Sequence, residues 1–348
     1  MKSIKLLATA LVASCVLAPA WADSKNADIY GTVAFGLMST ENSAGVSNTE
    51  VLNESRIGFQ GSKVLPKLGD TKFVWQIESG FMGPNGLSAQ PYESGTLGTR
   101  DTWAGFEGGF GKVRVGRLLT PYGETLDWPF ANGGVGPLVE STSVPGGGSY
   151  VRESDQFRWD SVATGPLTAS VSFGRGTRST SAGNAFVAAN SSSLSGVVHY
   201  AVGGATLHAG YEKNGNRSAN SGENTNLLLA AQSPSFGGFS LYGAYIKGTS
   251  TITSTTGSYT PGNYDRATNQ FALQYATGDW ISKISYAKNQ DLSGPVADKG
   301  GDITAIQVLY IVDPSLVTYA RYVSASNPNT TAGWWNKSRV LIGMEYGF

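Results

Sequence analysis

Apolar and polar residues alternate along most of this chain, and the closing segment shows the pattern most clearly. From residue 339 onward every second side chain is apolar, namely Val340, Ile342, Met344, Tyr346 and Phe348. The residues between them are mostly polar or small. Successive side chains of a β-strand point to opposite sides, so this period of two predicts a strand with one apolar face.

The same alternation recurs between turn signals and predicts about sixteen strands. In each of them the large apolar side chains share one face, as Phe73, Trp75 and Ile77 do. The expected strands span residues 28–38, 54–63, 70–80, 99–107, 111–118, 151–160, 165–174, 193–203, 204–213, 224–234, 236–247, 266–278, 279–289, 301–312, 313–323 and 336–348.

The connections between these strands alternate between short and long. Short ones carry the Gly, Pro and Asp residues of tight turns, as at Gly203-Gly204 and Asp313-Pro314. Long ones, rich in Ser, Thr, Asn and Gly, cover residues 38–53, 81–98, 119–150, 174–192, 213–223, 247–265, 289–300 and 324–335. This arrangement predicts an antiparallel up-and-down transmembrane β-barrel. Its first and last strands should pair, because unpaired edge amides are very costly in lipid.

The first residues have the features of a secretion signal. Lys2 and Lys5 precede an apolar run, and Ala20-Trp21-Ala22 is a small-residue cleavage site, which predicts a signal peptide at 1–22 and a mature barrel domain at 23–348. Val12-Ala13-Ser14-Cys15 resembles a lipoprotein box, but the apolar run continues beyond it, which favours the later site. Cys15 is the one cysteine, so the mature chain would contain neither disulfides nor thiolate metal ligands.

Composition agrees with a barrel and offers little else. The 25 basic and 25 acidic residues balance, and no basic stripe suggests nucleic acid. The mean hydropathy of −0.14 is what a wall with one apolar and one wet face would average. A secreted β-sandwich also alternates, but aromatic residues near the strand ends fit two interfacial bands better than one core.

Six segments carry a resemblance to a known family, namely residues 28–33, 55–62, 73–81, 100–106, 110–117 and the terminal Phe348. Together they resemble the general trimeric porins of Gram-negative bacteria, in particular the β-proteobacterial type. The resemblance implies a sixteen-stranded outer-membrane barrel, a homotrimer, and a third long loop folded into the lumen. It implies passive diffusion of small hydrophilic solutes and ions, with no cofactor. It also makes Tyr346 and Phe348 the signal read by the barrel-assembly machinery.

Alternation places a set of basic residues on the water side of the predicted wall. A lipid-facing Arg or Lys at the midplane would cost about 2–4 kcal/mol, so these groups should line water. Arg152 lies where the third loop rejoins the wall, and Arg117 could face either way. The predicted pore-lining basic residues are Arg56, Lys72, Arg100, Arg114, Arg152, Arg158, Lys283 and Arg321.

The longest loop, residues 119–150, is rich in Pro and Gly, which excludes a long helix. Its acids are Glu124, Asp127 and Glu140. The resemblance implies that these acids face the basic wall across a constriction. The resulting transverse field would orient dipolar solutes. Because arginines outnumber the nearby acids, the sequence predicts a mild preference for anions.

Three other functions remain open from the sequence. One is a substrate-preferring channel for small organic anions on the same fold, and another is an adhesion barrel acting through its loops. The last is a barrel enzyme such as a phospholipase, which would need a His beside a nucleophile on the lipid face. The only histidines, His199 and His208, flank the Gly203-Gly204 turn at predicted wet-side positions and could approach one another. This disfavours an enzyme.

Overall fold

A computed structural model describes most of the chain. The described residues are 27–82, 97–132, 136–137, 144, 152–175, 191–216, 221–255, 259–296, 298–326 and 337–348. The predicted signal peptide therefore lies outside them. Among the described residues, no helix is both long enough and apolar enough to cross a membrane.

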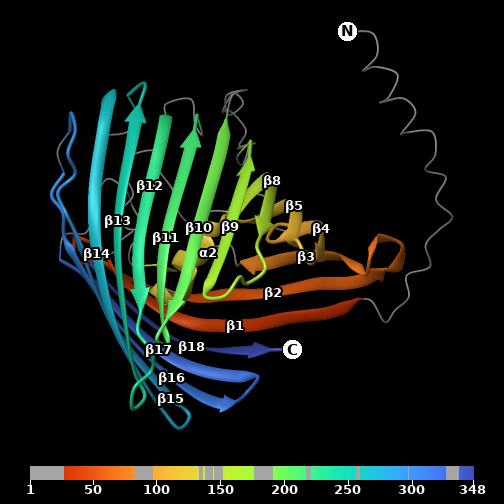
Figure 1. The fold of residues 1–348 in the computed structure, drawn as a ribbon. Helices are drawn as coiled ribbons and strands as arrows, with labels where there is room; N and C mark the ends of the chain where they lie inside the picture. Colours follow the sequence, from red (N-terminus) through yellow and green to blue (C-terminus); the bar gives the residue numbers. More distant parts are fainter. Residues whose placement is uncertain are drawn as a thin grey trace.

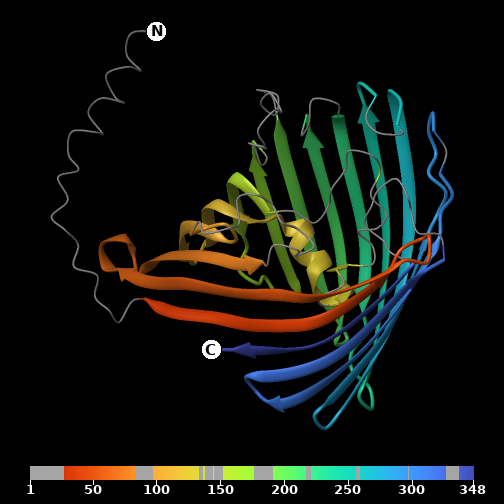
Figure 2. The same ribbon diagram turned by 180° about the vertical axis from the view of Figure 1, so that it is seen from behind.

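Sixteen antiparallel strands form one closed barrel (Figures 1 and 2), which confirms the predicted fold class. Consecutive strands pair with one another, β5 pairs with β8 across the long third connection, and β1 pairs with β18. The barrel strands are β1 Asp28–Glu41, β2 Ser47–Leu65, β3 Thr71–Met82, β4 Thr102–Gly108, β5 Gly111–Leu119, β8 Arg152–Asp160, β9 Leu167–Gly174, β10 Ser192–Val202, β11 Ala205–Gly215, β12 Ser221–Gln232, β13 Phe239–Ile252, β14 Gly262–Thr277, β15 Trp280–Asn289, β16 Asp302–Asp313, β17 Leu316–Ala325 and β18 Ser338–Gly347.

Barrel closure depends on the two ends of the chain. β1 pairs with β18 from Thr32↔Gly347 to Glu41↔Ser338. The N–H of Gly31 donates to the carbonyl of Phe348 at 3.0 Å, and the N–H of Phe348 donates back at 3.1 Å. No edge of these terminal strands is left to face lipid, as the membrane environment requires.

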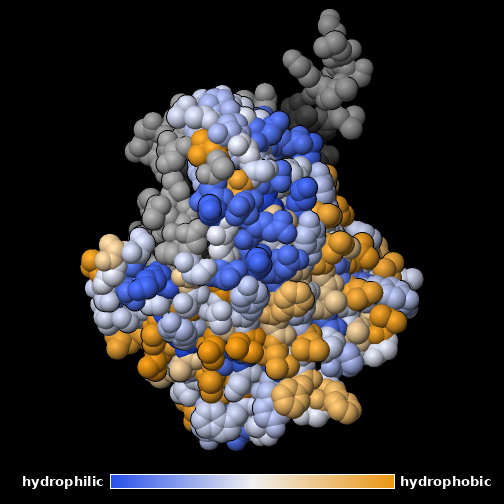
Figure 3. All heavy atoms as spheres, turned by 90° about the vertical axis from the view of Figure 1, so that its left-hand side faces the viewer, coloured by the Kyte–Doolittle hydropathy of each residue, from blue (hydrophilic) through white to orange (hydrophobic). Residues whose placement is uncertain are grey.

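The alternation in sequence becomes an alternation of faces. On β12, Leu227 and Leu229 are 42% and 51% exposed on the outside, whereas Leu228 between them is fully buried on the inside. The terminal Val340, Ile342, Met344, Tyr346 and Phe348 all lie on the outer, exposed face. Figure 3 shows apolar residues gathered over the lower part of one side of the molecule, with polar residues above them.

Tight turns join the strands at one end of the barrel. Gly203 and Gly204 both have positive φ angles, 56° and 79°, and Gly237 and Gly238 repeat this in the β12–β13 turn. Such angles suit glycine because an L side chain would clash with the backbone. The β2–β3 turn holds a short 3₁₀ helix, η2 Pro66–Leu68.

The first predicted long loop is wrong. Residues 38–53 were expected to form a long connection, but β1 and β2 continue to the pair Glu41↔Ser47. The connection is thus confined to residues 42–46. Strands β1 and β2 continue beyond their alternating apolar residues into a polar stretch around Asn48 and Thr49. Strands that have water on both sides need no apolar face, so alternation could not reveal them.

Candidate functional site in the barrel lumen

The third connection begins with a short helix inside the barrel. Helix α2 Pro121–Thr125 follows β5 and continues as the π-helical turn η3 Leu126–Phe130. Thr120 caps it, since its side-chain hydroxyl accepts the N–H of Gly123 at 3.1 Å, and Pro121 occupies the first turn. A two-stranded pairing of β6 Ala131–Asn132 with β7 Gly136–Pro137 follows. We refer to residues 120–130 as the inserted segment.

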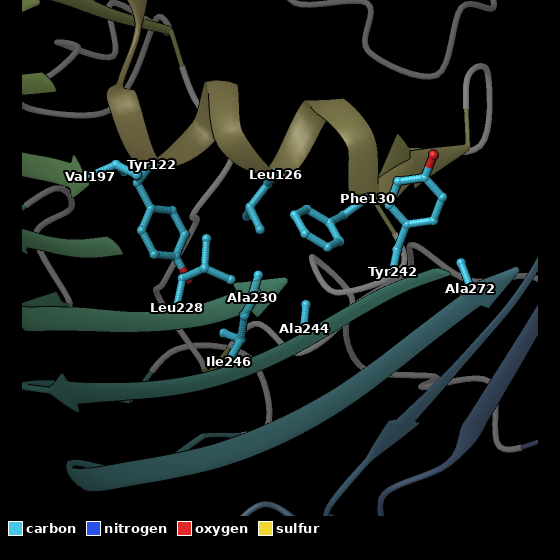
Figure 4. Close-up of a cluster of buried hydrophobic side chains, with 10 residues drawn as sticks. All are labelled: Tyr122, Leu126, Phe130, Val197, Leu228, Ala230, Tyr242, Ala244, Ile246 and Ala272. Atoms are coloured by element: carbon cyan, nitrogen blue, oxygen red, sulfur yellow. The ribbon is translucent and has the colours of Figure 1, made fainter. Parts of the chain in front are cut away.

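The apolar side of the inserted segment packs on the inner wall. Tyr122, Leu126 and Phe130 are spaced four residues apart, so they share one side, and all three are fully buried. Figure 4 shows them pointing from the helix onto the strands beneath. The contacted wall residues, from β10 and β12–β14, are Val197, Leu228, Ala230, Tyr242, Ala244, Ile246 and Ala272. Burying each large side chain stabilises this placement by about 1.5–3 kcal/mol.

Small wall residues make room for this packing. A Cβ on Gly210 of β11 would lie 3.2 Å from the Tyr122 ring, so a glycine here lets the ring approach the sheet. The Tyr122 hydroxyl is buried without a hydrogen-bond partner among the described atoms. Burial raises the pKa of Tyr122 well above its ordinary value, so the phenol stays neutral.

Hydrogen bonds fasten the inserted segment at both ends. At its start, the Thr120 hydroxyl donates to the carboxylate of Glu212 on β11 at 2.6 Å, and the N–H of Tyr122 donates to the Ser195 hydroxyl at 3.1 Å. At its end, the amide of Gln270 on β14 donates to the carbonyl of Phe130 at 2.8 Å. Glu212 is fully buried, and these contacts reach across strands β10 to β14. The position of the segment is therefore fixed by the wall.

A row of ion pairs connects the inserted segment to strands β5 and β8. Arg114 of β5 pairs with Asp160 of β8 at 2.6 Å, Asp160 pairs with Arg158 at 2.7 Å, and Arg158 contacts Glu124 of α2. Arg114 also lies over the Trp103 ring, 5.1 Å from its centre. Glu124 therefore contacts Arg158 directly and does not face it across the open pore. This corrects the expectation for Glu124, because the helix lies close enough to β8 for a direct ion pair.

A second polar cluster lies on β1–β4. Arg100 pairs with Glu78 at 2.5 Å, and the Tyr30 hydroxyl donates to the same carboxylate at 3.0 Å. Tyr30 fits there because Gly58 beneath it has no side chain: a Cβ on Gly58 would lie 2.2 Å from the ring. Arg152 pairs with Asp101 at 3.3 Å above this cluster. Two more of the predicted basic residues, Arg100 and Arg152, are therefore paired with carboxylates.

The remaining predicted residues divide by exposure. The strand register places Arg56 and Lys72 on the inner face, where Lys72 is exposed and Arg56 is half-buried. Lys283 and Arg321 also point inward but are only 4% and 5% exposed. Lys283 lies over the Tyr242 ring, while Arg321 lies over the Tyr319 ring and pairs with Glu345 at 3.4 Å. These two are covered, so they reach little water.

Arg117 and two loop acids complete the predicted set. Arg117 points to the outer face, opposite Thr102 in the register, and donates to the carbonyls of Thr99 and Arg152. Asp127 lies half-buried on η3. Glu140 falls outside the described residues.

Several inner-face charges were missed by sequence reasoning. Arg266 and Arg339 are almost fully buried on the inner wall, and Arg266 pairs with Asp298 at 3.2 Å. Glu54 of β2 faces the lumen close to Arg321, Arg100 and Arg56. Strict alternation would have found all three, because each is on the polar side of its strand. The pairing of each acid with its arginine had no signal in the sequence.

Comparison with known families settles the identity of this barrel. Residues 8–330 match the family described as Gram-negative porin. The chain is a Gram-negative porin. It is 30% identical over 343 residues to the chitoporin of Vibrio furnissii, an alignment that covers 93% of this porin and 91% of that protein. A shorter match, 32% identical over 108 residues, is to the major outer membrane protein P.IB of Neisseria sicca and covers 28% of each chain.

Solved porin structures share the fold of this porin. The anion-selective porin from Comamonas acidovorans superimposes with a TM-score of 0.72 at 16% identity, covering 92% of this porin and 99% of that chain. A loop-deletion mutant of OmpT from Vibrio cholerae gives 0.69 at 15% identity, with coverages of 92% and 99%. The porin is thus an outer-membrane β-barrel that lets small hydrophilic solutes and ions diffuse passively through a water-filled pore.

Proposed function

We propose that this porin conducts small anions mildly better than cations and catalyses no reaction. The observation that carries the proposal is the contrast between its charges. Arg56 and Lys72 reach the lumen without an ion pair among the described residues, whereas Glu78, Asp160 and Glu124 are each held by an arginine. Glu50 and Glu54 lie on the same wall and keep the preference weak.

The inserted segment would set the size limit of this pore. It occupies part of the lumen and is fastened to β10–β14, so solutes must pass between it and the basic flank on β2–β5. In a narrow lumen salt screens charges incompletely, because the Debye length is about 10 Å at 0.1 M. Arg56 therefore acts on ions across much of the remaining channel.

Two other functions have less support. A substrate-preferring channel for small organic anions would use the row of Arg114, Asp160 and Arg158, and would show as a current block that saturates with solute. A barrel phospholipase would need its histidine on the lipid face, whereas His199 and His208 both lie on the inner wall. This supports the proposal that no bond is made or broken.

Arg56→Ala should shift the reversal potential toward cation preference at low salt. Arg114→Ala should shift it less, since Asp160 keeps Arg158 as its partner. Glu124→Gln should shift it toward anions, because it removes a negative charge from the lumen while Arg158 stays paired with Asp160. The measurement is the zero-current potential of the bilayer-reconstituted porin under a salt gradient. The shifts should fade as salt rises.

Lys63→Ala is the matched control, because Lys63 is exposed on the outer face of β2 and its loss should leave selectivity unchanged. A wild-type porin that prefers cations would refute the sign of the proposal. A response to Lys63→Ala equal to that of Arg56→Ala would show that the lumen position does not matter.

We also propose that the porin assembles as a homotrimer. The outer faces of β2 and β3 carry Ile57, Phe59, Phe73, Trp75 and Ile77, an apolar surface that could bury against another copy. Arg117 stands on the outer face of β5, which is separated from β3 only by β4, and a cation on the lipid face of a barrel costs free energy. Cover by another copy would relieve that cost.

Native mass measurement in mild detergent should give the mass of three chains. Ile57→Arg with Trp75→Arg should yield single barrels that still bind detergent and resist heat as folded barrels do. Leu229→Arg on β12, whose side chain is 51% exposed on the outer wall away from β2 and β3, tests charge alone and should leave the trimer intact. Single wild-type barrels in every gentle detergent would contradict the proposal.

A further inference from the structure

The two histidines of this porin face one another on the inner wall. His199 of β10 and His208 of β11 are direct register partners, and their Nδ1 atoms are 2.7 Å apart. The rings are steeply inclined, at 80°, with centres 5.0 Å apart. They are the only histidines in the chain, and the one cysteine lies in the predicted signal peptide. Imidazole chemistry in the mature porin is therefore concentrated at this one place.

The separation of the two nitrogens suits a cation that binds ligands at right angles. Metal–imidazole bonds are about 2.0–2.1 Å long, so a right angle needs nitrogens about 2.9 Å apart and a tetrahedral angle needs about 3.4 Å. The observed 2.7 Å is nearer the right angle. Tetragonal geometry with nitrogen ligands is typical of Cu²⁺ and Ni²⁺ rather than Zn²⁺.

Within the part of the chain that the structure describes, the surroundings of the two rings provide no third His, Cys, Asp or Glu ligand. Both rings are half-buried, so they are reachable from the lumen. Among the described residues, no group of three or more His, Cys, Asp or Glu could hold a metal ion. The charged groups that act on His199 are Glu124 and Arg158, which are paired with each other. Water would therefore complete the coordination shell.

Proton placement limits how tightly such a site can bind. Without metal, one Nδ1–H donates to the other Nδ1. Binding requires both Nδ1 lone pairs, so each neutral ring must then carry its proton on Nε2. Nε2 of His208 is buried without a hydrogen-bond partner among the described atoms, and an unpaired buried donor costs about 1–3 kcal/mol. Moderate affinity follows.

The pair is located next to the inserted segment. The Phe130 ring stands edge-on to the His208 ring, with centres 5.8 Å apart at 86°. We propose that His199 and His208 form a two-nitrogen site for a divalent transition-metal cation of the Cu²⁺ or Ni²⁺ type, and that the bound cation adds positive charge beside the inserted segment. The occupied pore therefore favours anions more strongly than the empty one.

The test uses the untagged, full-length mature porin with CuCl₂ as the probe and MgCl₂ as the ionic control. Electron paramagnetic resonance should show Cu²⁺ with two nitrogen ligands in wild type. His199→Gln and His208→Gln should each remove the two-nitrogen signal. In planar bilayers micromolar Cu²⁺ should move the reversal potential further toward anions, reversibly with a chelator, and should have no such effect on either variant.

Acidification provides a second readout. Protons compete with the metal for the imidazole nitrogens, so the Cu²⁺ effect should weaken as the pH falls and return at neutral pH. Heat-modifiability on gels confirms that each variant remains a folded barrel. Cu²⁺ bound through two nitrogens in the His199→Gln/His208→Gln double variant, or no nitrogen-bound Cu²⁺ in wild type, would overturn the assignment.

Discussion

Leu126→Asp should release the inserted segment from the wall and abolish the sharp size limit of the pore. Leu126 is fully buried between the helix and the strands, in the cluster that includes Leu228 and Ile246. An ionised carboxylate cannot stay there, since the effective cost of burying a charge is several kcal/mol. Each kcal/mol counts strongly, because about 1.4 kcal/mol changes an equilibrium tenfold.

The barrel itself should survive this substitution. Its strands are held by backbone pairing around the closed sheet, and the segment contributes none of those pairs. We expect folded barrels with an unsteady single-channel current, and liposome-swelling assays in which larger sugars enter than wild type admits. Glu212→Gln should have a smaller effect in the same direction, because the apolar contacts of Tyr122, Leu126 and Phe130 remain.

Tyr122→Phe is the matched control for this prediction. It removes a buried hydroxyl that has no partner among the described atoms, while the ring keeps its contacts. The segment should therefore stay in place, held as firmly as before or more so. A steady current and an unchanged sugar cut-off in Leu126→Asp would show that the apolar contact does not hold the segment.

Phe348→Ser should reduce the amount of porin in the outer membrane several-fold. We propose, as the family resemblance implies, that the terminal aromatic residue is read by the barrel-assembly machinery. The ring is 52% exposed on the outer face, so a partner could reach it. It also covers Gly31 at the point where the barrel closes: a Cβ on Gly31 would lie 2.4 Å from the ring.

Two variants separate recognition from packing. Phe348→Tyr keeps an aromatic ring and should assemble normally. Met344→Ser removes an outward apolar group from the same strand, 48% exposed, and should leave levels near wild type. The measurement is immunoblotting of outer-membrane fractions with and without heating. Undiminished levels of Phe348→Ser with native heat-modifiability would count against the recognition role.

Much of the fold could be read from the sequence because strand alternation is a local property. Val340, Ile342 and Met344 define an outer face without reference to any other part of the chain, and closure follows from the physics of the bilayer. For the same reason the inward direction of Arg56, Arg114, Arg158, Lys283 and Arg321 could be predicted from the residues beside them. Arg117 was undecided because it follows the last clearly alternating positions of its strand.

The relations between lumen residues needed the tertiary structure. Arg158 meets Glu124 only because strand register and the course of the third connection bring them together. The contact of His199 with His208 is the exception, because the Gly203-Gly204 turn between them is local in the sequence. Burial was equally invisible, since Lys283 and Arg321 have the same alternation as Lys72 but are covered on the inside. The sequence by itself determined which side of the wall each residue faces, because that depends on a period of two. Only the folded barrel decided which charges are paired, covered or open to water, because those depend on contacts between distant strands.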